Sequence, residues 1–88
     1  MNFIVYILYS KSVNQYYIGH TKDITDRLFR HKNSGSKFTK KAVDWELVYT
    51  ESYSDKSAAY SREMEIKKKK SRKYIEDLLN RSVERPDA

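Results

Sequence analysis

The stretch Phe3-Ile4-Val5-Tyr6-Ile7-Leu8-Tyr9 consists entirely of β-branched, aromatic or leucine residues. Both faces of a strand with this sequence are apolar, so the pattern predicts a central strand that is buried on both sides. The residues Lys11 to Asn14 come next and predict a turn. Gln15 to His20 then predicts a second strand, which returns beside the first to form a hairpin.

Two tyrosines face each other in this predicted hairpin. A hairpin centred near Lys11 and Ser12 places Tyr6 opposite Tyr17, and directly opposed residues lie about 4.5–5.5 Å apart at Cβ. Tyrosine is also common in strands as a packed aromatic ring with a polar tip. The pair is therefore either plain packing or two phenols held side by side for a function.

A first helix is predicted from about Ile24 to Lys32. The candidate caps are Thr21 or Asp23 at its start and Gly35 beyond its end. The predicted inner face consists of Ile24, Leu28 and Phe29. Arg27 and His31 are four residues apart, so they share a different face of the same helix.

Residues 34–44 are predicted to form a loop with an interleaved aromatic residue. It carries Lys37, Lys40 and Lys41, with Phe38 among them. Basic residues around an aromatic ring suit a phosphate backbone and an unstacked base. A solvated loop that is anchored by one phenylalanine explains the same pattern equally well.

Trp45 to Tyr53 alternates in polarity and predicts a third strand, with Trp45, Leu47 and Tyr49 on one side. The first helix lies between the second and third strands in the chain. Two more helices are predicted after the third strand. The fold class predicted from this order is α+β, a three-stranded antiparallel sheet flanked by helices in the order β-β-α-β-α-α.

The second helix is predicted from about Lys56 to Lys70, with Ser54-Asp55 as its cap. Ala59 and Ile66 lie on its apolar stripe, and Glu63 lies between them. An unpaired charge in such a position is costly, so a cation beside it would account for it. The alternative is that Glu63 pairs with a lysine or reaches solvent.

The last predicted elements are a short basic block and a third helix. Lys67 to Lys70 is expected to be the exposed end of the second helix, where cations are favoured. Ser71 is the candidate cap of the third helix. Its apolar stripe is Tyr74, Ile75, Leu78 and Leu79. We expect one domain over residues 1–80 and a frayed tail over residues 81–88.

Composition narrows the class of function. The chain of 88 residues has no cysteine and two histidines, which excludes thiolate metal sites and a zinc cage, while a carboxylate site for a hard cation stays open. No apolar run is long enough to span a membrane, so a cytoplasmic protein is expected. The net charge of +6 favours nucleic acid or an anionic surface as a partner.

The order of these residues resembles the GIY-YIG nuclease superfamily over nearly the whole chain. It is most similar to the small stand-alone bacterial GIY-YIG proteins, which are related to the catalytic domain of the excision-repair subunit UvrC. The matching pieces are Val5-Tyr6-Ile7, Tyr17-Ile18-Gly19, Arg27 with His31, and Arg62-Glu63. Ile4-Val5 stands where the first motif is named for Gly-Ile.

The resemblance implies cleavage of DNA phosphodiester bonds with Mg²⁺ or Mn²⁺. It implies that Glu63 is the metal ligand, that Arg27 holds the scissile phosphate, and that Tyr17 or Tyr6 activates water. Lys22, Arg27 and His31 are the candidates to stabilise a phenolate. The catalytic candidates are thus Tyr6, Tyr17, Arg27, His31 and Glu63. The candidates for DNA contact are Lys22, Lys37, Lys40, Lys41 and Lys67.

One position departs from the family pattern: Ile75 stands where many family nucleases carry an asparagine. The leading hypothesis is a metal-dependent DNA endonuclease, in DNA repair or recombination. The alternatives are a nucleic-acid-binding module without catalysis and a docking partner of a larger repair complex. Glu63 favours the first, because a pure binder has no need of a carboxylate near phosphate.

Overall fold

The computed structural model describes residues 2–33 and 42–84, and the side chains of residues 30–33 and 82–84 are outside the described part. The elements are β1 (Phe3–Ser10), β2 (Gln15–Thr21), α1 (Ile24–Asn33), β3 (Trp45–Tyr53), α2 (Lys56–Lys69) and α3 (Arg72–Glu84). This is the predicted α+β order. No helix in these ranges is long and apolar enough to cross a membrane.

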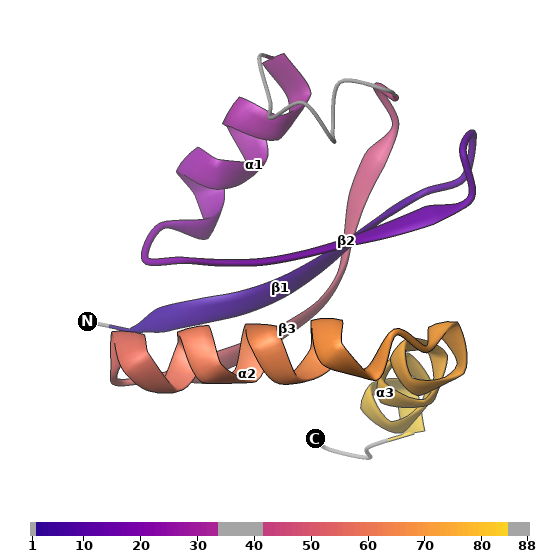
Figure 1. Cartoon of the computed structure of the whole chain (residues 1–88). Coiled ribbons are helices and arrows are strands. Elements are labelled where there is room, and N and C mark those ends of the chain that lie inside the picture. The colour runs from indigo at the N-terminus through magenta and orange to yellow at the C-terminus, as the bar shows by residue number, and fades with distance from the viewer. Residues whose placement is uncertain (1, 34–41, 85–88) are drawn as a thin grey trace.

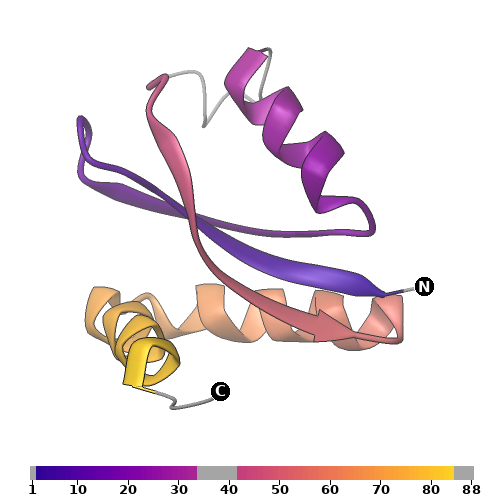
Figure 2. The same ribbon diagram turned by 180° about the vertical axis from the view of Figure 1, so that it is seen from behind.

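The sheet has the antiparallel order β2-β1-β3, so β1 is the central strand, as predicted. Val5 to Leu8 at its centre are each at most 1% exposed. Figures 1 and 2 show α1 on one face of the sheet and α2 on the other, with α3 crossing near the end of α2. An apolar residue on either side of β1 is therefore covered by a helix.

The hairpin register differs from the prediction by two residues. β1 continues to Ser10, which pairs with Gln15, so Tyr6 lies opposite Gly19 and not opposite Tyr17. The error arose from centring the turn one position too early, because the whole run of residues 11–14 forms it. A shift of two residues keeps every side chain on its face. Tyr6 and Tyr17 are accordingly diagonal neighbours, with ring centroids 6.3 Å apart.

A β-bulge in β3 overturns the prediction that Trp45, Leu47 and Tyr49 share one side. Leu8 pairs with Leu47 and Ile7 pairs with Tyr49, so one extra residue enters β3 between these pairs. An extra residue reverses the alternation beyond it. Trp45 packs with Leu8 on the α1 face, whereas Tyr49 packs against the cluster on the α2 face.

The start and the inner face of α1 follow from two observations. Asp23 is the N-cap, because its carboxylate accepts a hydrogen bond from the backbone N–H of Asp26 at 3.0 Å. Ile24 and Leu28 pack against the α1-face cluster as predicted. Phe29 was expected beside them, but it is 65% exposed because its position points away from the sheet. Gly35, the predicted C-cap, lies outside the described residues.

The helices α2 and α3 complete the core on the opposite face. Asp55 caps α2. The buried residues of α2 are Ala59, Glu63 and Ile66, which confirms the predicted stripe. Lys70 ends α2 in the left-handed conformation, with φ of 45°. Ser71 caps the next helix through the N–H of Tyr74. Helix α3 continues to Glu84, so it extends past the boundary predicted at residue 80.

Candidate active site

The two tyrosines meet above the glycine of the second motif. A Cβ atom at Gly19 would lie 2.7 Å from the hydroxyl oxygen of Tyr6 and 3.3 Å from a ring carbon of Tyr17. Any larger residue would therefore displace the phenol of Tyr6. The backbone of β2 thus provides the space in which the Tyr6 ring lies, and this explains the glycine physically.

The environment of Tyr6 favours its protonated form. The residue is 1% exposed, and burial raises the pKa of its phenol well above the ordinary value. Tyr17 and Glu63 raise this pKa further, whereas Arg27 lowers it in part. Tyr6 therefore stays a hydrogen-bond donor at neutral pH. Tyr17 lies beside Tyr6 on the α1 face of the sheet, with ring centroids 6.3 Å apart, whereas Glu63 belongs to α2 on the opposite face.

Arg27 on α1 has unused capacity to bind an anion. Its Nε atom is buried and has no hydrogen-bond partner within the described part of the chain. A buried donor without a partner costs free energy, which an incoming acceptor would recover. Arg27 lines a cleft of about 570 Å³ together with Phe3, His20, Thr21, Lys22, Asp23, Asp26 and Lys56. Guanidinium is suited to phosphate because it binds bidentately and keeps its charge.

Glu63 on α2 is buried and bonded on both carboxylate oxygens. The residue is 7% exposed. Nδ1 of His20 lies 2.5 Å from its Oε1, and Nζ of Lys67 lies 2.6 Å from its Oε2. Pairing with a lysine was one of the two outcomes left open by the sequence. Lys67, a candidate for DNA contact, is therefore bonded to Glu63 in this structure.

His20 is the residue of this site that sequence reasoning missed. It follows Gly19 directly, so the period of two along β2 directs its side chain to the face opposite Tyr17. That face is covered by α2, which carries Glu63. Strand alternation alone would have placed His20 on the face opposite Tyr17, but only the fold shows that α2 covers that face.

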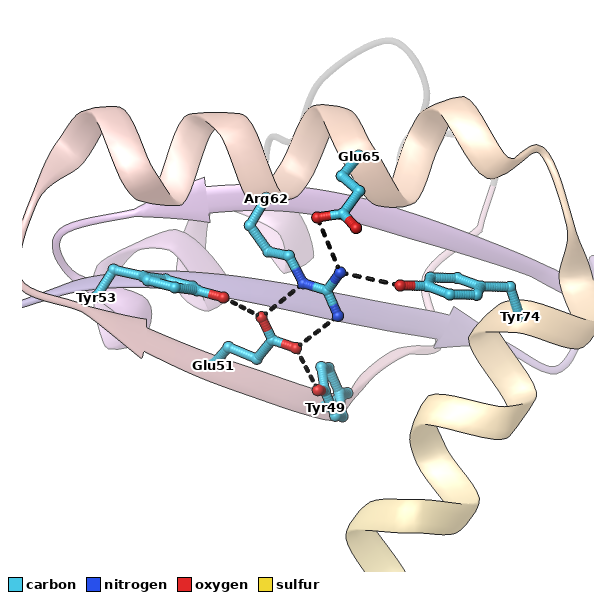
Figure 3. A network of polar contacts seen from close by, with 6 residues as sticks. All are labelled: Tyr49, Glu51, Tyr53, Arg62, Glu65 and Tyr74. Carbon is cyan, nitrogen blue, oxygen red and sulfur yellow. Dashed lines mark hydrogen bonds and ion pairs between the residues drawn. The ribbon is translucent and has the colours of Figure 1, made fainter.

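A polar network separate from the contacts of Glu63 is centred on Arg62, the preceding residue in the chain (Figure 3). The guanidinium of Arg62 donates to both oxygens of Glu51 at 2.9 and 3.1 Å. Its Nη1 donates to Tyr74 at 2.9 Å and pairs with Glu65 at 3.2 Å. The network joins β3, α2 and α3 at one point, and it fixes how α2 lies across the sheet.

The phenols of Tyr49 and Tyr53 complete this network by donating to Glu51 (Figure 3). Burial and these bonds raise the pKa of each phenol to about 12. Burial alone would raise the pKa of Glu51, but the bonds from Arg62 and the two phenols outweigh it, and the pKa lies below its ordinary value. Glu51 is therefore held as a carboxylate.

The other predicted site residues are divided between the cleft and the part of the chain that the structure does not describe. Lys22 lines the cleft with Arg27. His31 is part of α1, but its side chain is outside the described residues, and so are Lys37, Lys40 and Lys41. Ile75 is 8% exposed in the core of α3, so it offers no polar group to the site.

The donor set fits a hard divalent cation and not a metal cage. Within residues 2–33 and 42–84 there is no cluster of three or more histidine, cysteine or acidic side chains. Mg²⁺ is commonly bound through one or two carboxylates together with waters and substrate phosphates. Glu63 is one such carboxylate, and a cation that bound to it would compete with Lys67, which pairs with its Oε2.

Comparison with known proteins gives a consistent result. A model of the GIY-YIG catalytic domain matches residues 2–75. A UPF0213 protein of Staphylococcus epidermidis is 48% identical over 52 residues, which are 58% of this chain and 63% of that protein. The match therefore spans less than two thirds of that relative. The UPF0213 protein YazA of Bacillus subtilis is 36% identical over 83 residues, covering 90% of this chain and 83% of YazA.

A solved structure has the same fold. The solution NMR structure of the UPF0213 protein BH0048 from Bacillus halodurans matches with a TM-score of 0.57 and 34% identity. The match covers 91% of this chain and 84% of that chain. Both the sequence and the fold comparisons thus point to the same group of proteins.

Proposed function

The chain belongs to the GIY-YIG family, and on this premise we propose that it is a divalent-cation-dependent endonuclease that hydrolyses phosphodiester bonds in DNA. The observation that carries the proposal is geometric: the rings of Tyr6 and Tyr17 meet at Gly19 on the α1 face of the sheet. On the same side, the buried Nε of Arg27 has no hydrogen-bond partner within the described part of the chain. Glu63 lies on α2, at the opposite face of the sheet. The net charge of +6 agrees with a polyanionic substrate. The proposed context is DNA repair or recombination in the cytoplasm.

In this proposal Arg27 binds the scissile phosphate. The acceptor oxygens of the phosphate satisfy its buried Nε, and the guanidinium charge offsets the charge that develops in the transition state. Lys22 and Lys56 line the same cleft and neutralise the neighbouring phosphates. His31 would add to the positive field from the same helix.

The two tyrosines take different roles. A phenol accepts a proton from water only when it is ionised, and the raised pKa of Tyr6 keeps that residue protonated. We therefore assign the general base to Tyr17 and the orienting hydrogen-bond donor to Tyr6. The water oxygen forms the new bond to phosphorus as its proton passes to Tyr17. The bond to the leaving oxygen breaks, and that oxygen takes up a proton from a solvent water molecule.

Glu63 would hold the divalent cation, Mg²⁺ or Mn²⁺. When bound, such an ion supplies positive charge beside the phosphate and polarises its oxygens. His20 and Lys67 keep the Glu63 carboxylate bonded on both oxygens in this structure. The ammonium of Lys67 competes with a cation for Glu63, so in this proposal Lys67 turns toward solvent when the ion binds; its side chain is 45% exposed.

The test is cleavage of labelled single-stranded, branched and duplex DNA with Mg²⁺, with Mn²⁺ and with chelator. Tyr17→Phe is expected to slow cleavage about 10²–10⁴-fold, the usual contribution of a general base. Tyr6→Phe is expected to cost less. The wild-type rate should rise between about pH 6.5 and 9.5, and this rise should persist in Tyr6→Phe and disappear in Tyr17→Phe.

Two outcomes would contradict the proposal. Cleavage that is equal in all three proteins would show that the tyrosines only pack. DNA binding without any cleavage, in every metal, would favour the alternative of a nucleic-acid-binding module or a docking partner of a larger complex.

A further inference from the structure

An exposed aromatic ring lies beside the candidate active site. Tyr60 on α2 is 52% exposed. Its ring meets that of His20 edge to face, with centroids 5.9 Å apart and an angle of 78°. The two rings line a hollow of about 670 Å³, and the remaining lining residues are Asp55, Lys56 and Ser57.

This hollow adjoins the proposed phosphate cleft. His20 and Lys56 line both the hollow and the cleft that contains Arg27. A nucleotide whose phosphate lies at Arg27 therefore has an aromatic surface in the neighbouring hollow. Lys56 and Lys22 supply positive charge along the route, which complements a nucleic-acid backbone. The carboxylate of Asp55, which also lines the hollow, caps α2 by accepting a hydrogen bond from the backbone N–H of Ser57 at 3.3 Å.

We propose that the hollow binds an unstacked nucleobase next to the scissile phosphate, with the base stacked on the ring of Tyr60. This inference rests on the proposed function and specifies its substrate class. Stacking on an aromatic side chain tolerates any base, because every base has a π face. A paired base in a duplex must first be extruded, at a cost of a few kcal/mol, whereas a single-stranded or mismatched base avoids most of that cost. The preferred substrate is therefore DNA with an unpaired nucleotide beside the cut.

The geometry distinguishes this site from an isolated surface tyrosine. Scattered exposed apolar side chains are normal and carry no function. The ring of Tyr60 is instead in contact with the ring of His20, which is fixed in turn by its bond to Glu63. A ring held in this way presents its free face to a ligand without further ordering.

The test measures DNA binding in chelator, so that it is independent of cleavage. The probe is a single-stranded oligonucleotide with one 2-aminopurine, placed at successive positions in separate samples. Stacking quenches its fluorescence, so one or two positions should be quenched on binding. Tyr60→Leu keeps an apolar side chain but removes the ring, and we expect this variant to lose that quenching and to bind about 5- to 150-fold more weakly.

The controls distinguish a loss of base stacking from a change in electrostatic attraction and from unfolding of the variant. Tyr60→Phe and Tyr60→Trp keep a ring and should bind and quench like the wild type. Tyr9→Leu makes the same change at the far end of β1, where the ring packs on Tyr16, and should leave binding unchanged. The slope of log affinity against log salt should be equal in all variants, because no charge is altered. Circular dichroism and thermal melting verify that each variant is folded.

The result that overturns this inference alone is unchanged binding and quenching in Tyr60→Leu, while the wild type still cuts DNA. A failure of every variant, including the wild type, to bind DNA at low salt would instead overturn the proposed function with it. Equal affinity for single-stranded and fully paired DNA in the wild type would also exclude the proposed substrate class.

Discussion

Two mostly buried glutamates in this small fold differ in how many hydrogen bonds they receive, and this difference suits one to a structural role and the other to ligand binding. The side chains of Glu51 and Glu63 are 18% and 9% exposed. An ionised carboxylate accepts about four hydrogen bonds. Glu51 receives four: two from Arg62, one from Tyr49 and one from Tyr53. Its capacity to accept hydrogen bonds is saturated within the fold.

Glu63 differs because it keeps acceptor capacity for a ligand. Each of its oxygens has one partner among the described residues, His20 on one and Lys67 on the other. Lys67 belongs to the exposed end of α2, and His20 lines the open cleft. The saturated carboxylate is suited to hold secondary structure together, and the unsaturated one is suited to bind a cation. The following predictions test this distinction, starting with the largest expected effect.

The first prediction concerns removal of the charge from each glutamate in turn. Glu63→Gln keeps the volume of the side chain and removes the proposed metal ligand, so DNA cleavage should fall about 10²–10³-fold or more. Its melting temperature should stay close to the wild-type value, because an amide can still bond to both neighbours. Glu51→Gln should show the reverse, with a lower melting temperature and, at a temperature where it is folded, nearly normal cleavage. If Glu63→Gln unfolds the domain while Glu51→Gln only loses activity, the two roles are reversed.

The second prediction concerns Arg62, which is the direct neighbour of Glu63 in the chain. Arg62→Met leaves the Glu51 carboxylate with little solvent and no cation, and breaking such a pair typically costs about 3–5 kcal/mol. Because both side chains keep some exposure, 17% and 18%, we expect about 3 kcal/mol in urea unfolding. Lys73→Met is the matched control, since its pair with Asp77 is exposed and should contribute less than about 1 kcal/mol.

A double mutant sharpens the second prediction. Glu51→Gln together with Arg62→Met removes both charges, so its loss of stability should be smaller than the sum of the two single losses. Additive losses would show that the two side chains act independently and would contradict the network drawn in Figure 3.

The sequence alone predicted the features that depend on local periodicity and missed those that depend on tertiary packing. The central strand and the shared face of Tyr6 and Tyr17 depend on a period of two, which is visible locally. That face was predicted correctly even though the register was wrong by two residues, because such a shift is a whole period. The bulge in β3 depends on how β1 packs against it, so local alternation did not reveal it.

The partners of the glutamates are set by tertiary packing. Glu51 and Arg62 are 11 residues apart, and His20 and Glu63 are 43 residues apart. No local pattern in the chain relates such distant positions. The candidate residues Tyr6, Tyr17, Arg27 and Glu63 were found through the order of motifs in a family. The structure brings Tyr6 and Tyr17 together on the α1 face of the sheet and places Glu63 on the α2 face. The contact from His20 required the fold.

The third prediction weakens the saturated carboxylate by one bond. Tyr53→Phe removes a donor to Glu51, and a hydrogen bond to a charged group contributes about 1.5–3 kcal/mol. We expect a loss near the lower limit, measured by urea unfolding at neutral pH. The Tyr53 pKa is raised to about 12 from an ordinary value near 10. The stabilisation is therefore complete below about pH 10 and is lost as the pH rises toward 12.

The control for the third prediction is activity. Tyr53→Phe should cut DNA at the wild-type rate when it is folded, because its hydroxyl bonds only to the saturated carboxylate. A difference in stability between the two proteins that grows above pH 10 would contradict the raised pKa of Tyr53.

The last prediction concerns Lys67, the cation that pairs with the unsaturated carboxylate of Glu63. The ammonium of Lys67 lies 2.6 Å from Glu63 and occupies an oxygen that a divalent ion would use. Lys67→Met removes this competitor, so Mn²⁺ should bind more tightly. A lysine that is 45% exposed contributes about 0.2–1 kcal/mol to such a pair, which corresponds to a gain in affinity of about 1.4- to fivefold. Electron paramagnetic resonance of free Mn²⁺ measures this without DNA.

Lys68→Met is the matched control, because it removes the same charge from the next residue, which is exposed at the same end of α2. A smaller gain shared by both variants would reflect only the lower net charge, and the gain specific to Lys67→Met is the direct competition. The specific part should decrease with added salt, because an exposed lysine is screened. If Lys67→Met binds Mn²⁺ no better than Lys68→Met at low salt, Lys67 does not compete with the metal. The carboxylate of Glu63 would then be as fully committed to the fold as that of Glu51.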